Sequence, residues 1–162
     1  MQGIRQASGV RVDVARLVTA YREAEYRWEL DGRWHPLAIG QPAPGIERAF
    51  PEASRFGLLS AWNPHSVERP EAVNRSDDEI LHAMLKASGL PFRAGFSSAR
   101  NRSWREPSWV VVDMASPAFD ALARHFGQLG TLYWRRGEPV RLHMYAARPA
   151  AVAACEAVDW LE

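Results

Sequence analysis

The segment that decides the fold is Arg55–Ser66, RFGLLSAWNPHS. Its first eight residues are mostly apolar and do not alternate with polar ones, so they predict a strand that is covered on both faces. Pro64 ends this strand, because proline donates no ladder hydrogen bond and favours an extended backbone at Asn63. Trp62, Asn63 and His65 therefore stand where a buried strand either simply leaves the core or begins a binding site.

Helical and strand patterns alternate on both sides of this segment. Their order predicts a single α+β domain with a mixed or antiparallel sheet and helices packed on one or both faces. We expect a core at about 56–134, with an N-terminal helix and hairpin (11–40) and a C-terminal helix (149–160) packed on it. Further turns are predicted at Asp31-Gly32 and at Arg136-Gly137-Glu138.

The helix that ends at Gly89 has two starts that the sequence does not separate. Ser76 and Glu79 have the spacing of a capping box, whereas Pro70 allows a start near Glu71 that would bring Asn74 into the first turns. In either case its buried stripe is predicted to hold four apolar residues. They are Ile80, Leu81, Met84 and Leu85.

The composition excludes several classes of protein. The chain has 162 residues, one cysteine and a net charge of +1. The lone Cys155 excludes an internal disulfide and a cysteine-based metal site, and near-neutral charge does not favour broad nucleic-acid binding. No apolar segment is long enough to span a membrane or to act as a secretory signal, so a cytoplasmic protein is expected. We expect no metal and no cofactor, and the oligomeric state is not predicted.

Short ordered motifs resemble a bacterial family catalogued as domain of unknown function 3293, over about residues 56–134. The motifs are Ala61-Trp62-Asn63-Pro64, Asn74, Trp104 with Glu106 and Ser108, and Phe126-Gly127-Gln128. Pro107 departs from the pattern, since the family often has a second acidic residue there. The resemblance implies a bounded unit and a set of positions but no activity.

Polar residues at the predicted strand ends form the candidate site. We expect Asn63, Glu106 and Gln128 to converge, because each follows or precedes a core strand and needs hydrogen-bond partners if it is buried. The complete set of candidate ligand-binding residues is Asn63, Asn74, Arg100, Arg102, Trp104, Glu106 and Gln128. Simpler roles stay open: Asn63 could bond its own turn while Trp62 packs in the core, and Gln128 could bond carbonyls at a helix end.

Three functions fit these residues. The first is binding of a small anionic or nucleotide-like ligand, because guanidinium groups beside aromatic rings suit phosphate and bases. The second is a hydrolase or transferase acting on a phosphate- or sugar-bearing substrate, with Glu106 or His65 as the catalytic acid or base. The third is a protein-interaction or regulatory module that uses surface tryptophans. Those tryptophans would be Trp28, Trp34, Trp134 and Trp160.

Overall fold

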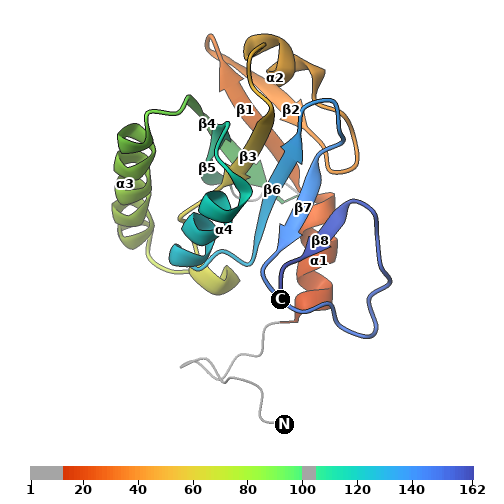
Figure 1. Cartoon of the computed structure of the whole chain (residues 1–162). Coiled ribbons are helices and arrows are strands. Elements are labelled where there is room, and N and C mark those ends of the chain that lie inside the picture. Colours follow the sequence, from red (N-terminus) through yellow and green to blue (C-terminus); the bar gives the residue numbers. More distant parts are fainter. Residues whose placement is uncertain (1–12, 100–104) are drawn as a thin grey trace.

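The structure, a computed structural model, describes residues 13–99 and 105–162 (Figure 1). These residues form four α-helices, one short 3-10 helix and a single eight-stranded sheet. The helices are α1 (Val14–Glu23), α2 (Pro44–Ala49), α3 (Glu71–Ser88) and α4 (Ser116–His125), and η1 is Pro64–Ser66. The strands are β1 (Glu25–Leu30), β2 (Arg33–Leu37), β3 (Arg55–Leu59), β4 (Phe92–Ser98), β5 (Arg105–Val112), β6 (Gly130–Arg135), β7 (Arg141–Met144) and β8 (Val158–Trp160).

The strand order across the sheet is β2-β1-β4-β5-β3-β6-β7-β8, so β3 lies inside the sheet, between β5 and β6. Both of these neighbours run antiparallel to β3, and among the strands of the described residues β7 and β8 form the only parallel pair. The prediction of an α+β fold with a mixed sheet is therefore confirmed. The predicted hairpins are also present, with β1 paired to β2 around Asp31-Gly32 and β6 paired to β7.

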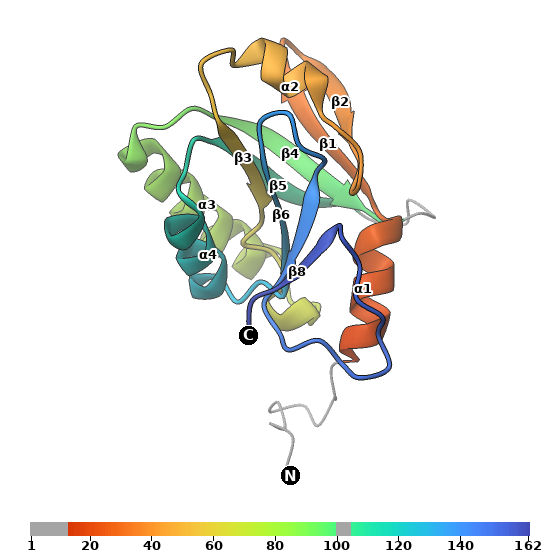
Figure 2. The ribbon, with the colours of Figure 1, turned by 45° about the vertical axis from the view of Figure 1, so that its right-hand side comes forward.

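Helices cover β3 on both faces, as its unalternating sequence predicts (Figures 1 and 2). Phe56 and Leu58 belong to one hydrophobic cluster, which α1 and α2 cover. Leu59 belongs to a second cluster, which α3 and α4 cover. On that second face Gly57 leaves room for the ring of Phe119, because a Cβ at Gly57 would stand only 2.4 Å from it.

Helix α3 begins at Glu71 after Pro70, so the earlier of the two starts is the observed one and Ser76 lies inside the helix. The face turned to the protein carries Asn74, Leu81 and Leu85, which are buried. The predicted stripe was half wrong, because Ile80 and Met84 are exposed. The face of this longer helix that packs on the sheet is therefore not the predicted one. On that face Asp78 accepts a hydrogen bond from Trp109 Nε1 at 2.9 Å, and His82 stacks on the same indole.

The predicted C-terminal helix at 149–160 is wrong. That segment forms turns and then β8, which pairs with β7. Leu142 N donates to Ala157 O at 2.8 Å, and Arg141 donates twice to the carboxylate of Asp159, at 2.8 Å each. These tertiary bonds outweigh the helical propensity of the alanines, which is a weak preference in a short segment.

None of the helices in the described ranges is long and apolar enough to cross a membrane.

Candidate functional site

A cavity of about 680 Å³ lies between α1, the sheet and the loop that follows β3. Its size falls within the usual range for small-molecule sites, roughly 300–1,000 Å³. Aromatic, amide, carboxyl and guanidinium groups all contribute to its wall. The polar and aromatic lining residues are Tyr21, Tyr26, Trp62, Asn63, Ser66, Glu68, Arg69, Glu71, Asn74, Ser97, Ser98, Arg105, Glu106 and Gln128.

Strand register places Glu106 in this cavity. Glu106 on β5 lies opposite Ser97 on β4, which in turn lies opposite Tyr26 on β1. Residues that are directly opposite on neighbouring strands project from the same face, so these three side chains form a row across the sheet. The side chains of Val110 and Val112 follow Glu106 along the same face at even spacing, and they pack in the cluster under α1. The row therefore forms the floor of the cavity.

Burial raises the pKa of Glu106 to about 7, although the hydrogen bond from Asn63 and the nearby Ser60 hydroxyl act in the opposite direction. The Nδ2 group of Asn63 lies 3.5 Å from Glu106 Oε2, which makes a long hydrogen bond. Two tyrosines share this environment. Burial raises the pKa of Tyr21 to about 12 and also raises that of Tyr26, and the nearby charge of Glu106 raises both further. Near neutral pH, Glu106 is thus poised between its acid and carboxylate forms.

The loop after β3 has an unusual backbone. Asn63, His65 and Ser66 all have positive φ values (45°, 58° and 58°), a region that non-glycine residues seldom adopt. The expectation of an extended Asn63 before Pro64 was wrong, because Asn63 is left-handed. Asparagine tolerates this conformation better than most residues, and here hydrogen bonds hold it. Backbone strain of this kind tends to collect at functional sites.

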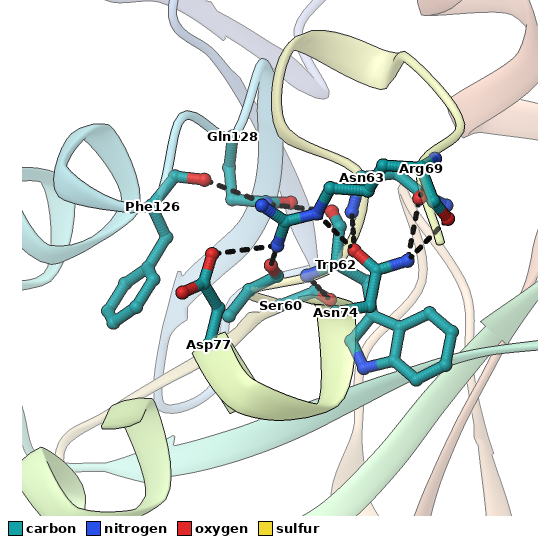
Figure 3. A network of polar contacts seen from close by, with 9 residues as sticks. Ser60, Trp62, Asn63, Arg69, Asn74, Asp77, Phe126 and Gln128 are labelled. Carbon is teal, nitrogen blue, oxygen red and sulfur yellow. Dashed lines mark hydrogen bonds and ion pairs between the residues drawn. The ribbon is translucent and has the colours of Figure 1, made fainter. Parts of the chain in front are cut away.

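Asn74 and Arg69 hold the loop in place (Figure 3). Asn74 Oδ1 accepts from the backbone N–H of Asn63 at 2.9 Å and from Arg69 Nε at 2.5 Å. Asn74 Nδ2 donates to Asn63 Oδ1 at 2.8 Å. The Nη2 group of Arg69 donates to Ala61 O at 3.0 Å and to Asp77 at 2.8 Å. Asn74 is only 2% exposed, so its amide serves the network rather than solvent.

The sequence did not single out Arg69. Its one signal was Pro70, which opens α3 and so places the preceding residue within about one turn of Asn74. Tyr21 and Tyr26 were also missed as site residues, because they lie outside the family-like segment. Tyr21 reaches the loop through a hydrogen bond between its hydroxyl and that of Ser66, at 3.1 Å.

Gln128 is buried and also lines the cavity. Its Nε2 donates to Trp62 O at 3.0 Å and to Phe126 O at 3.3 Å (Figure 3). The proposed role at a helix end is therefore real, since Phe126 is the C-cap residue of α4. The bond to Trp62 ties Gln128 to the loop that carries Asn63.

The structure brings Asn63, Glu106 and Gln128 to one cavity. Asn63 reaches Glu106 directly, and Gln128 joins them through the carbonyl of Trp62. Trp62 is half-buried and lines the cavity instead of packing in either hydrophobic cluster, contrary to the simpler alternative. The three polar groups form both a structural network and part of a cavity wall. That they bind a ligand stays a prediction.

Other candidates lie elsewhere. His65 is exposed and lines a separate hollow of about 270 Å³ with Asp77 and His125, so it does not share the cavity with Glu106. Arg100, Arg102 and Trp104 lie outside the described residues. Their neighbour Arg105 is described, and it lines the cavity. Within 13–99 and 105–162, no three His, Cys, Asp or Glu side chains lie close enough together to hold a metal ion.

The expectation of surface tryptophans was wrong for two of the four. Trp28 and Trp134 are each 1% exposed and pack in the core. Trp160 is half-buried, and only Trp34 is largely exposed, at 43%. These residues do not form an aromatic surface that would favour the interaction-module hypothesis.

The sequence of this region matches that of a known family. Residues 59–130 match the family described as "Protein of unknown function (DUF3293)". The predicted resemblance is confirmed. The matched segment contains Asn63, Asn74, Glu106 and Gln128, and it leaves out α1 and β1, which supply the tyrosines of the cavity. No curated protein and no solved structure shows significant similarity to the chain.

Proposed function

We propose that the cavity binds a small nucleotide-like ligand, with its base inside the cavity and its anionic group at Arg105. The observation that carries this proposal is the composition of one cavity wall. A half-buried carboxyl group and buried or half-buried amide groups lie among aromatic rings, beside an exposed arginine. Small-molecule sites commonly combine an apolar lining with a few convergent polar groups.

The aromatic lining supports a planar ligand. Tyr21, Tyr26 and Trp62 come from α1, β1 and the loop after β3, so they approach the cavity from different elements. Stacking of a base on an aromatic side chain is worth about 1–3 kcal/mol and tolerates any base. The amide and carboxyl groups of Asn63, Gln128 and Glu106 would then discriminate between base edges.

Arg105 supports the anionic part of the ligand. Its guanidinium lies over the ring of Phe96, with the central carbon 4.4 Å from the ring centroid. Arg105 alternates with Glu106 along β5, so it projects from the other face of the sheet, where this contact holds its planar group while the residue still lines the cavity. From there its edge would give forked hydrogen bonds to phosphate. Glu68 and Glu71 also line the cavity, so we expect the anion on the Arg105 side and not beside α3.

The test is binding of nucleosides and nucleoside monophosphates, measured by calorimetry and by the shift in melting temperature. A monophosphate should bind more tightly than its nucleoside, and Arg105→Gln should remove most of that difference without loss of the fold. Arg48→Gln, an exposed arginine on α2, is the matched control. Binding should weaken with salt, because exposed charges are screened beyond about 8 Å at physiological ionic strength. Absence of binding by every nucleoside and nucleotide would refute the proposal.

A phosphate- or sugar-directed enzyme is the second candidate, and the raised pKa of Glu106 favours it. A carboxyl group that titrates near pH 7 can act as a general base or acid. His65 lies outside the cavity and does not support it. Turnover of any nucleotide that binds, followed by chromatography, separates the two candidates, because Glu106→Gln should abolish turnover by an enzyme.

A further inference from the structure

The hydrogen bonds around Glu106 determine which end of each neighbouring amide donates and which accepts. Asn74 Oδ1 accepts from Asn63 N and from Arg69 Nε, so the other end of the Asn74 amide must donate. That donor points to Asn63 Oδ1, which also accepts from Arg69 N at 3.3 Å. The amide of Asn63 is thereby oriented with Nδ2 toward Glu106. The network ends with a donor aimed at the Glu106 carboxyl group, an arrangement that suits its ionised form.

The same reasoning fixes the orientation of the Gln128 side-chain amide. Its Nε2 group donates to two backbone carbonyls, those of Trp62 and Phe126, so both of its N–H bonds are in use. Its Oε1 atom receives no hydrogen bond from the described residues and is left as an acceptor on a cavity-lining side chain. Glu106 receives only the long bond from Asn63 and a contact from Ser60 among those residues. Among the described residues, the cavity wall thus offers two hydrogen-bond acceptors, the Glu106 carboxyl group and Gln128 Oε1, that receive few or no donors.

We infer that the ligand presents a pair of adjacent N–H donors to Glu106, as the N1–H and 2-amino groups of a guanine-type base do. The inference rests on the proposed function and names its base class. A carboxylate has two oxygens and can accept two parallel N–H bonds, whereas a base edge that alternates donor and acceptor leaves one oxygen facing an acceptor. Gln128 Oε1 is available for a further donor on the same ligand.

This arrangement makes the affinity for the ligand depend on the protonation state of Glu106. Paired donors bind the carboxylate form of Glu106, and burial raises the pKa of this group to about 7 in the free protein. Below about pH 7 the ligand must displace a proton, so affinity should fall by up to tenfold for each pH unit. Above about pH 8 affinity should be constant. A base edge of the adenine or cytosine type would prefer the protonated carboxyl group, so its affinity would rise as the pH falls.

The experiment measures the Kd of guanosine, inosine and adenosine by calorimetry between pH 5.5 and 8.5. Inosine lacks the 2-amino group and is the matched ligand. Guanosine should bind about 10- to 100-fold more tightly than inosine above pH 7.5, which is the usual worth of one bidentate contact. Glu106→Gln should lose that preference together with the rise in affinity with pH. Glu79→Gln, an exposed carboxylate on α3, should keep both.

The outcomes separate the inference from the function on which it rests. Preference for adenosine, or affinity that rises as the pH falls, would overturn the donor-pair inference and leave nucleotide binding intact. Failure of all three nucleosides and their monophosphates to bind would overturn both. Melting curves of the Glu106→Gln protein show whether it is folded. If it is unfolded, the comparison of guanosine with inosine across pH in the native protein decides the question by itself.

Discussion

At the scale of single residues, the molecule concentrates strain where it also concentrates polar contacts. Asn63 is left-handed directly before a proline, and His65 and Ser66 follow it with positive φ. Each such residue costs of order 1–3 kcal/mol and persists only where its surroundings hold it. Here Asn74 and Arg69 provide that support with four short hydrogen bonds. The strain aims the Asn63 amide at Glu106, which the extended geometry expected before proline would not necessarily do.

Glu106 should make stability depend on pH. Its folded-state pKa, about 7, is above the ordinary value of 4.5, so the folded protein binds more protons between these values. Stability should therefore fall as pH rises from about 4.5 to 7, by about 1–3 kcal/mol, and stay level above that. The measurement is urea unfolding at several pH values for the native protein and for Glu106→Gln. The variant should lack this decline, and an identical decline in both proteins would show that another group causes it.

The sequence predicted part of the site for a physical reason. Asn63, Glu106 and Gln128 stand at the ends of core strands, and polar groups there need partners, so their convergence could be expected. Arg69 could not be found in this way, because its importance depends on where α3 begins. The role of Tyr26 depends on the register of β1 against β4, which only the assembled sheet specifies.

At the scale of elements, the sequence predicted the periodic segments and failed where tertiary contacts override a local preference. The unalternating β3 and the two hairpins are as expected. The alanine-rich segment favours helix, but it becomes β8 because β7 offers an open edge with which it can pair. The exposed Ile80 and Met84 of α3 show the same effect, since buried Asn74 dictates the helix face.

The packing of α4 on β3 should depend on Gly57. An added Cβ would stand 2.4 Å from the Phe119 ring, and neither the strand nor the buried ring can move easily. Gly57→Ala should therefore destabilise the fold by about 1–3 kcal/mol, as overpacked cores do. Combining it with Phe119→Leu should recover part of this loss, which a double-mutant cycle by chemical denaturation would measure. Strictly additive losses would contradict the proposed clash.

Gly45→Ala is the matched control for this experiment. Gly45 lies in α2, and a Cβ there would meet nothing within 4 Å. Alanine favours helix over glycine by about 1 kcal/mol, so this variant should be neutral or slightly more stable.

At the scale of the whole molecule, two polar networks join segments that are distant in sequence. The cavity combines the segment that resembles the family with α1 and β1, which lie outside it. The second network lies under α4, where Asp120 accepts from Tyr145 Oη at 2.6 Å and contacts His143 Nδ1 at 3.1 Å. The other ring nitrogen of His143 lies 3.3 Å from Asp159 on β8. This second network thus connects α4 to the C-terminal strand through β7.

Asp159 should therefore decide whether β8 stays on the sheet. Hydrogen bonds from Arg141 hold the pKa of Asp159 below its usual value, so the carboxylate stabilises the fold above about pH 4 and loses this effect as pH falls through the lowered pKa. At pH 7, Asp159→Asn should cost about 1–2 kcal/mol, because the pair with Arg141 is partly exposed. Hydrogen exchange should accelerate at the amides of Leu142 and Leu161, which bond across the β7–β8 edge. Glu156→Gln, an exposed acid three residues earlier, should leave both quantities unchanged. Unaltered exchange in Asp159→Asn would mean that backbone pairing with β7 is sufficient to hold β8, and that the Arg141–Asp159 ion pair does not contribute to its attachment.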